Sequence, residues 1–204
     1  ANLQGAWSAE KLANGNVLIA CNSQSRVIEV DPNGKIVWQH SVPNALNAKG
    51  LDNGNFLIAQ HSNGQALEVT RDKQIVWQYK TQGNCSDIHR LDNGNTLIAS
   101  YSGPVVEVTP DGKVVWQYGE RIQTYGIQPL PDGSVLIAEH PGRVFEVNRD
   151  KQIVWEFSEP NPVDVFRLEN GNTLITGRQR FIEVTPDKKI VWQQAGNQYG
   201  SARR

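Results

Sequence analysis

The chain repeats itself about every 39 residues, and this period constrains its fold more than any other feature of the sequence. A segment close to Leu-x-Asn-Gly-Asn-x-Leu-Ile-Ala occurs five times, at 12–20, 51–59, 91–99, 130–138 and 168–176. A second segment ends at Trp38, Trp77, Trp116, Trp155 and Trp192, which are five of the six tryptophans. Repeats of this length predict an array of equal structural units, each of which buries its apolar surface against its neighbours.

Each repeat carries two turn signals between short apolar runs. The first is an Asn-Gly or Asp-Gly pair, which accepts the positive φ of a tight hairpin turn, at 14–15, 53–54, 93–94, 132–133 and 170–171. The second is a turn such as 32–35 or 110–113, with Arg-Asp-Lys-Gln variants at 71–74 and 149–152. The runs between turns are five or six residues long and rich in Val, Ile, Trp and Phe, so they predict strands. In the third repeat we expect strands near 87–91, 96–101, 105–109 and 114–118.

Strands such as 17–20 and 56–59 are apolar without alternation, so both faces of each small sheet must be covered. A four-stranded blade between two neighbours meets this requirement. The sequence therefore predicts an all-β, five-bladed β-propeller with four antiparallel strands per blade. We expect one domain over 1–204, with blades at about 1–40, 41–80, 81–119, 120–158 and 159–204. An open solenoid is the alternative, but it would expose an apolar face.

Closure of the ring is a separate question, because five blades is a small number for a propeller. No strand is exchanged between the two ends of the sequence. The ring would close by packing of the first blade on the fifth, or another subunit would complete it. We expect a five-bladed monomer.

The stretch from Asn93 to Trp116 resembles the repeat of quinoprotein-like (PQQ-binding-like) bacterial β-propellers. Within it, Asp111-Gly-Lys-Val-Val-Trp116 is similar to their tryptophan-docking motif, in which an outer-strand Trp wedges between blades. The resemblance covers all five repeats and implies the propeller fold. It is less informative about activity, because the superfamily includes dehydrogenases, arylsulfotransferase-like enzymes, assembly scaffolds and secreted proteins. The chain lacks the adjacent cysteine pair of quinoprotein dehydrogenases, so we expect no cofactor.

Composition excludes several classes of partner. Twenty Lys and Arg against 21 Asp and Glu give a net charge of −1, so the basic face of a nucleic-acid-binding protein is not expected. No apolar run approaches the ~20 residues of a membrane-spanning helix. Cys21 and Cys85 have no metal-ligand spacing and are expected to be small buried residues without a disulfide. The chain begins at Ala1 and contains no Met, as it would after removal of a signal peptide or after other trimming of its start; of these we expect the first, and with it a periplasmic or secreted location.

Residues that recur in every repeat are expected to be structural. A glutamate precedes Val in each predicted third strand, at Glu29, Glu68, Glu107, Glu146 and Glu183. We expect these side chains to form hydrogen bonds or ion pairs within the blade, for example with Lys35 and its equivalents. The repeated tryptophans are expected to pack at the rim by the same argument.

The candidate site is predicted from the loops that differ between repeats. Two of the four connections have constant length in every repeat, whereas the other two vary, and loops that bind ligands vary on a rigid scaffold. Three sets of unlike residues lie beside the variable connections. After the second strand stand Asn22, His61, Tyr101, His140 and Arg178. On the inner strand stand Ser8, Asn47, Asp87, Gly126 and Asp164, and before the third strand stand Arg26, Gln65, Pro104, Arg143 and Arg180.

Donors, acceptors, an aromatic ring and cations that converge on a channel mouth suit a polar or anionic small molecule or a glycan. We expect ligand contacts from Asn22, His61, Tyr101, His140, Arg178, Asn47, Asp87, Asp164 and Arg143. No metal site is expected, since His61 and His140 have no third ligand at short spacing. Water that simply fills a polar channel is the plainest alternative.

The leading functional hypothesis is a non-enzymatic propeller that binds a ligand or docks another protein on the variable loops. The sequence has no Gly-x-Ser-x-Gly nucleophile elbow, and whether the protein is an enzyme stays open, with the balance against it. The alternative is an enzyme resembling arylsulfotransferase-like propellers. In that case His61 or His140 would be the nucleophile or base, and Arg143 and Arg178 would hold an anionic group. A lectin with five equivalent sites is disfavoured, because the loops share almost no chemistry.

Overall fold

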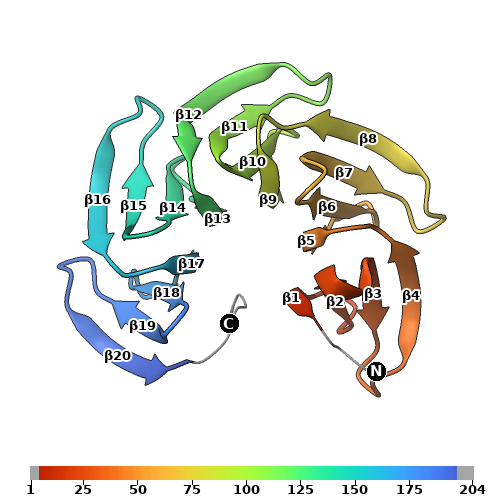
Figure 1. Ribbon diagram of the computed structural model, residues 1–204, viewed down its shortest axis with the longest axis horizontal. Helices are drawn as coiled ribbons and strands as arrows, with labels where there is room; N and C mark the ends of the chain where they lie inside the picture. Colours follow the sequence, from red (N-terminus) through yellow and green to blue (C-terminus); the bar gives the residue numbers. More distant parts are fainter. Residues whose placement is uncertain (1–4, 197–204) are drawn as a thin grey trace.

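The structure is a computed structural model, and it describes residues 5–196. In these residues twenty β-strands form five four-stranded antiparallel sheets, and the helical structure is one short 3-10 turn, Asn22–Gln24. Figure 1 shows the sheets as blades around a central channel, with the first strand of each blade inside and the fourth at the rim. The predicted five-bladed propeller is confirmed.

The strands follow one order in every blade. Blade 1 consists of β1 (Ala6–Lys11), β2 (Val17–Cys21), β3 (Arg26–Val30) and β4 (Ile36–Ser41). Blade 2 consists of β5 (Ala45–Gly50), β6 (Phe56–Gln60), β7 (Gln65–Val69) and β8 (Ile75–Lys80). Blade 3 consists of β9 (Asn84–Arg90), β10 (Thr96–Tyr101), β11 (Gly103–Val108) and β12 (Val114–Ile122). Blade 4 consists of β13 (Thr124–Pro129), β14 (Val135–Glu139), β15 (Arg143–Val147) and β16 (Ile153–Ser158). Blade 5 consists of β17 (Pro162–Arg167), β18 (Thr173–Gly177), β19 (Arg180–Val184) and β20 (Ile190–Ala195).

Blade 3 tests the strand prediction in detail. The second strand, Thr96–Tyr101, has the predicted bounds, and the other three lie where they were expected with shifted ends. The largest difference is in β12, which continues to Ile122 because Gly103 of β11 pairs with that residue across an irregular register. Pairing with a neighbouring strand therefore extends this rim strand beyond its apolar run.

The hydrophobic core lies between blades. Leu18, Val27 and Trp38 of blade 1 form one buried cluster with Phe56 and Ile58 of blade 2. Equivalent clusters join blades 2 and 3, blades 3 and 4, and blades 4 and 5. This arrangement explains why the second strands are apolar on both faces, as predicted. Burial of this kind stabilises at roughly 25 cal/mol per Å² of apolar surface, so the junctions between blades are the main stabilising elements.

The two cysteines behave as predicted. Cys21 and Cys85 are both buried and free. Burial raises the pKa of the Cys85 thiol, and the nearby Asp87 carboxylate raises it further, so the thiol stays protonated at neutral pH. In residues 5–196, no helix is long and apolar enough to span a bilayer.

The repeated glutamates are structural, as predicted, but their partners differ from the expected lysines. Glu29 is buried and accepts hydrogen bonds from Asn14 and Asn16 of its own blade. It also pairs with Arg71 of blade 2, whose Nη1 lies 2.7 Å from Glu29 Oε2. Lys35, the expected partner, is exposed at its turn. The glutamates of blades 1 to 4 therefore each join their blade to the next one.

The rim tryptophans also join consecutive blades. The indole Nε1 of four of them donates to a backbone carbonyl in the next blade: Trp38 to Arg71 at 2.8 Å, and Trp77, Trp116 and Trp155 to Pro110, Arg149 and Pro186 at 3.0 Å. The predicted rim packing is confirmed at these four junctions. Trp192 of blade 5 is 41% exposed.

The ring is open between blades 5 and 1. The inner strands contact one another in the order β1, β5, β9, β13 and β17, but no comparable contact joins β17 to β1 in the described residues. Figure 1 shows this opening between β17–β20 and β1–β4. The expected packing of the first blade on the fifth is therefore not present in the described part of the chain.

Candidate functional site

The propeller has two faces of different character. Each sheet is a simple antiparallel meander, so the β1–β2 and β3–β4 turns and their equivalents lie on one face, which we call the turn face. The β2–β3 loops and the connections between blades lie on the other, the loop face. The loops of variable length all belong to the loop face, where the sequence placed the candidate site.

A β-bulge marks the loop-face end of every inner strand. In each blade the register between the first two strands shifts by one residue, at Trp7, Leu46, Ser86, Tyr125 and Val163. Bulges bend a strand and redirect a side chain, and they are common next to binding sites. Two of the five bulge residues, Trp7 and Tyr125, are large aromatics.

Side chains from all five blades meet around Tyr125. Its ring centroid lies 4.8 Å from that of Tyr101, 5.9 Å from that of Trp7 and 6.4 Å from that of His61, with which it is stacked. Arg178 of blade 5 lies close enough to the Tyr125 hydroxyl to affect its ionisation. We call Trp7, His61, Tyr101, Tyr125 and Arg178 the mouth cluster. Each blade contributes one residue, and no two of them occupy the same structural position with the same chemistry.

The electrostatics of the mouth cluster are simple at neutral pH. Burial lowers the pKa of His61, so its imidazole is neutral, and its buried Nε2 has no hydrogen-bond partner in the part of the chain that the structure describes. Burial raises the pKa of Tyr125; Tyr101 adds to the rise, and the Arg178 guanidinium opposes it. The Tyr101 hydroxyl donates to Gln123 Oε1 at 2.9 Å. Arg178 therefore carries the formal charge of the cluster.

His140 occupies the position equivalent to His61, two blades away. Its backbone N–H donates to the Gln123 carbonyl at 2.7 Å, as that of His61 does to Asn44 at 2.9 Å. Both ring nitrogens of His140 are buried and have no hydrogen-bond partner among residues 5–196. Among the described ring contacts, none joins His140 to the mouth cluster. The structure thus gives two histidines with unused ring nitrogens on the loop face.

Asn47 and Asp87 lie deeper and connect blades. The Asn47 amide donates to Asp87 Oδ1 at 2.5 Å, and the backbone N–H of Ile127 donates to Asp87 Oδ2 at 3.0 Å. Both side chains are buried, and together these bonds link blades 2, 3 and 4. The ring of His89 also lies beside Asp87, at 3.3 Å. Burial by itself would lower the pKa of His89, but the Asp87 carboxylate outweighs it and raises the pKa above its usual value.

Asp164 is a buried wall of the same channel. Its Oδ1 accepts a hydrogen bond from the backbone N–H of Val165 at 2.9 Å. It packs so closely on Gly126 that a Cβ at that position would lie 2.4 Å from Asp164 Oδ1. Gly126 is required here for close approach of two inner strands. Asn47, Asp87 and Asp164 therefore form the channel wall, and their described contacts are with the protein itself.

Arg143 forms ion pairs with two carboxylates. It opens β15, the third strand of blade 4, and pairs with Glu139 at 2.5 Å and Glu156 at 3.1 Å. Arg180 makes two close contacts with the Glu159 carboxylate, at 2.9 and 2.7 Å. The cations predicted on the loop face are thus neutralised by carboxylates at these two positions.

The structure brings together three of the nine predicted ligand residues: His61, Tyr101 and Arg178. Asn22 is half-buried in its 3-10 turn and makes no described contact with the mouth cluster. The sequence analysis missed Trp7 and Tyr125. A signal was present, because Trp7 is the one tryptophan outside the rim series and Tyr125 has the same position in its repeat.

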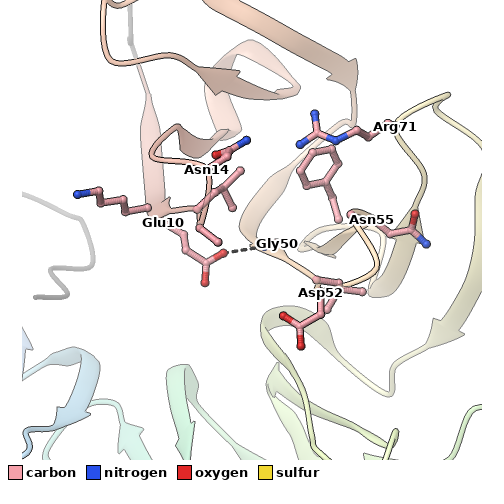
Figure 2. Close-up of a pocket in the computed structure, with 12 residues that line it drawn as sticks. Glu10, Asn14, Gly50, Asp52, Asn55 and Arg71 are labelled. Atoms are coloured by element: carbon pink, nitrogen blue, oxygen red, sulfur yellow. Dashed lines mark hydrogen bonds between the residues drawn. The ribbon is translucent and has the colours of Figure 1, made fainter.

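The turn face carries a cleft at each of the four junctions between consecutive blades. Figure 2 shows the cleft between blades 1 and 2, with a volume of about 350 Å³. Here Glu10 Oε2 accepts the backbone N–H of Gly50 at 2.7 Å, and Arg71 lies 5.0 Å above the ring of Phe56. The clefts at the next three junctions have volumes of about 550, 510 and 760 Å³. They repeat with the scaffold, so we interpret them as grooves between blades.

The described residues contain no group of three His, Cys, Asp or Glu side chains that could hold a metal ion. The clustered groups are aromatic rings, one guanidinium and neutral imidazole. Such groups bind organic ligands through stacking and hydrogen bonds.

The repeat signature extends over nearly the whole chain. Residues 2–194 match the PQQ_2 family profile, which is described as outer membrane protein assembly factor BamB. The chain belongs to this PQQ-type propeller family. The resemblance inferred from the Trp-ended repeats is therefore confirmed. A search of curated protein sequences finds no match to this PQQ-type propeller.

Several solved structures share the fold. A protein of unknown function from Bacteroides caccae aligns with a TM-score of 0.75 and 20% identity, over 94% of this chain and 81% of that chain. A streptogramin B lyase aligns with a TM-score of 0.76 and 13% identity, over 95% and 70%. A catalytically inactive virginiamycin B lyase from Staphylococcus aureus with quinupristin aligns with a TM-score of 0.74 and 15% identity, over 95% and 71%. At these identities the likeness concerns the propeller fold alone.

Proposed function

We propose that this PQQ-type propeller is a non-enzymatic binding protein that holds a polar or anionic small molecule, or a sugar unit of a glycan, on the mouth cluster. The observation that carries the proposal is that Tyr125 is surrounded by one side chain from each of the other four blades. Scaffold residues in this molecule recur from blade to blade. These residues do not recur, so the scaffold does not account for them.

The chemistry of the cluster favours a ring-shaped ligand with an acidic group. The rings of Trp7, Tyr101 and Tyr125 offer apolar faces for stacking. Arg178 supplies a planar cation that binds carboxylate, sulfate or phosphate through paired hydrogen bonds. The neutral imidazole of His61 can bond a hydroxyl through Nε2. An acidic sugar combines all three features, and a single such cluster implies one site per molecule.

A protein partner is the second form of this proposal. Trp, Tyr and Arg are the residues that dominate the binding energy of protein interfaces. The family description names an assembly factor of outer membrane proteins, which is a protein-interaction role. The same description supports a periplasmic or secreted location, which cell fractionation with a tagged chain would test.

Ligand-dependent thermal shifts and calorimetry test the site. We expect glucuronic or galacturonic acid to raise the melting temperature of the native protein, because a ligand that binds only the folded state stabilises it. Glucose serves as the uncharged comparison. Tyr125→Ala and Arg178→Ala should abolish the shift. Asn22→Ala changes a loop-face residue outside the cluster and should retain it.

One result would contradict binding at the mouth cluster. A ligand from the panel that binds with unchanged affinity to both Tyr125→Ala and Arg178→Ala binds elsewhere on the molecule. A pull-down partner lost in Tyr125→Ala but retained in Asn22→Ala would favour the protein-docking form instead.

An enzymatic role is the alternative, and one observation favours it. Within the described chain, His61 and His140 have buried ring nitrogens without hydrogen-bond partners, as a general base does before substrate binds. The streptogramin B lyase with the same fold is an enzyme by its name. Arg178, which lies beside the Tyr125 hydroxyl, would then hold an anionic substrate group. Turnover of aryl sulfates or of quinupristin by the native protein, abolished in the His61→Ala, His140→Ala double variant, would replace the binding proposal with the enzymatic one.

A further inference from the structure

An arginine joins every pair of consecutive blades, but it comes from two places in alternation. In blades 2 and 4 it lies in the β3–β4 type of turn; in blades 3 and 5 it lies at the end of the inner strand. The pairs, each formed with the glutamate of the preceding blade, are Arg71 with Glu29, Arg90 with Glu68, Arg149 with Glu107, and Arg167 with Glu146. The arginine of this ion pair therefore comes alternately from a turn and from an inner strand in successive blades.

The turn sequence changes with the source of the arginine. Where the arginine comes from the turn, the turn reads Arg-Asp-Lys-Gln, at 71–74 and 149–152; we call these turn-type blades. Where it comes from the inner strand, the turn begins with Pro110 or Pro186; we call these strand-type blades. Blade 1 has Pro32 in its turn and Lys11 at the end of its inner strand, so it is of the strand type. Blades 1, 3 and 5 are therefore of the strand type, and blades 2 and 4 are of the turn type.

The outward side of blade 5 carries an apolar surface that its equivalents bury. Leu174 is half-buried, whereas its counterparts Leu18 and Leu136 are fully buried against the next blade. Trp192 is 41% exposed, against 9% for Trp38. The other four rim tryptophans donate an indole hydrogen bond to a carbonyl in the turn of the next blade. Within residues 5–196, Trp192 has no such acceptor.

Blade 1 has an apolar side that faces away from blade 2, and the residues of that side are buried. Ile19, Cys21, Ile28 and Val30 form a hydrophobic cluster that contains blade 1 residues alone. The other four clusters of the described chain each span two blades. The opening is thus bordered by two sheet faces of the kind that elsewhere in the molecule pack on a further blade.

We propose that the opening between blades 5 and 1 is the seat of a sixth blade of the turn type. The occupant is a four-stranded sheet whose turn carries Arg-Asp-Lys-Gln. The backbone carbonyl of that arginine accepts the Trp192 indole N–H, as the carbonyl of Arg71 accepts that of Trp38. A direct contact between blades 5 and 1 would join two strand-type blades, whereas an inserted turn-type blade keeps the alternation unbroken around a ring of six.

The other side of the sixth blade can form the same two kinds of contact with blade 1, a tryptophan hydrogen bond and a glutamate ion pair. Its rim tryptophan donates to the Pro32 carbonyl, as Trp77 does to that of Pro110. Its glutamate meets Lys11, which stands where Arg90 stands in blade 3. The proposal concerns the rim and blade junctions, and it is independent of what the mouth cluster binds.

Appended blades test the proposal with a matched control. The full chain is extended after Arg204 with a copy of residues 123–158, a turn-type blade, or with a copy of residues 83–118, a strand-type blade of equal length. We expect the turn-type copy to raise the melting temperature by at least about 5 °C, and the strand-type copy by less than half as much. Arg149→Ala within the appended copy should remove much of the gain. Equal shifts from both copies, or no shift from the turn-type copy, would overturn the proposal.

The unmodified chain provides a second test that does not depend on a new variant folding. Oxidation by N-bromosuccinimide, followed by peptide mass spectrometry, should modify Trp192 at least about fourfold faster than Trp38, in line with their exposed fractions of 41% and 9%. Equal protection of the two indoles contradicts the open seat. A concentration-dependent dimer abolished by Trp192→Glu would assign the seat to a second copy and would also overturn the proposal.

Discussion

A buried glutamate in the third strand is the residue on which each blade junction depends. Glu107 accepts hydrogen bonds from Asn93 and Asn95 of its own blade and pairs with Arg149 of the next. Its carboxylate is nearly inaccessible to solvent, and the charge is tolerated there because both carboxylate oxygens accept hydrogen bonds. The same residue therefore stabilises a hairpin and the contact between two blades.

Removing this carboxylate should be costly. We expect Glu107→Ala to lower the free energy of unfolding by about 1–3 kcal/mol, because two amides and a guanidinium lose a common acceptor. Glu120→Ala, which changes an exposed glutamate on the rim strand of the same blade, should stay within about 0.5 kcal/mol of the native protein. Urea unfolding followed by circular dichroism measures both. A smaller loss for Glu107 than for Glu120 would contradict this account.

The same carboxylates predict a loss of stability in acid. Burial by itself raises the pKa of Glu29, but hydrogen bonds from Arg71, Asn16 and Asn14 outweigh it and hold the pKa below its usual value. The pKa of Glu107 is lowered in the same way. A lowered folded-state pKa gives stability that is present above the unfolded value of about 4.5 and is lost as the pH falls through the folded value.

Melting temperatures between pH 7 and pH 3 test this expectation. The native protein should lose stability steeply below about pH 4.5. The double variant Glu29→Gln, Glu107→Gln should be less stable at pH 7 and should show a shallower decline. Parallel curves for the two proteins would show that these carboxylates do not control the acid transition.

The inner strand is the element that decides what the channel contains. Its bulge places Trp7 and Tyr125 at the mouth, and the residues that follow, such as Asp87, connect consecutive inner strands by hydrogen bonds. Close approach of these strands leaves room for nothing larger than glycine at Gly126, beside Asp164. One element therefore supplies both the wall of the channel and the aromatic residues at its end.

Gly126→Ala should disturb this element specifically. The new Cβ would lie within 3 Å of Asp164 Oδ1, Asp164 Cα and the Val163 carbonyl oxygen, and backbone atoms cannot move away as a flexible side chain can. We expect a loss of about 1–3 kcal/mol in urea unfolding. Gly142→Ala is the matched control, since a Cβ there meets nothing within 4 Å. Equal effects of the two variants would exclude close packing of β13 on β17 as the reason for Gly126.

At the scale of the whole molecule, stability rests on contacts that run in one direction around the ring. In blades 1 to 4 the rim tryptophan and the glutamate engage the following blade, and an arginine of that blade reaches back to the glutamate. Junctions 1–2 to 4–5 have these contacts, but the described residues supply none of this kind between blades 5 and 1. Equivalent residues should therefore differ in energy according to their blade.

Two conservative variants measure this difference. Trp116→Phe loses the hydrogen bond to the Arg149 carbonyl and part of the contact with the Arg149 guanidinium, which lies 5.3 Å from the indole. We expect a loss of about 1–2 kcal/mol. Trp192→Phe, at the same position in blade 5, should cost less than about 0.5 kcal/mol in urea unfolding. A larger cost at Trp192 than at Trp116 would mean that the open side of blade 5 is covered in solution.

The sequence by itself determined the repeat, the four strands of each blade, the two hairpin turns, the burial of the cysteines and the face that carries the variable loops. These properties follow from local information: turn residues that accept positive φ, and apolar runs whose period and length select strands. It also indicated three members of the mouth cluster, because His61, Tyr101 and Arg178 break an otherwise regular pattern.

The tertiary structure alone decided which residues meet. Trp7 and Tyr125 lie three blades apart along the chain, and their contact depends on the direction of a bulge and on the rotation between blades. The partner of Glu29 proved to be an arginine 42 residues away rather than the nearby Lys35, because a neighbouring blade presents its turn to the buried carboxylate. The opening between blades 5 and 1 likewise reflects angles accumulated over all five sheets. A repeat specifies its own strands through local chemistry, but distances across the ring depend on how every repeat packs on the next.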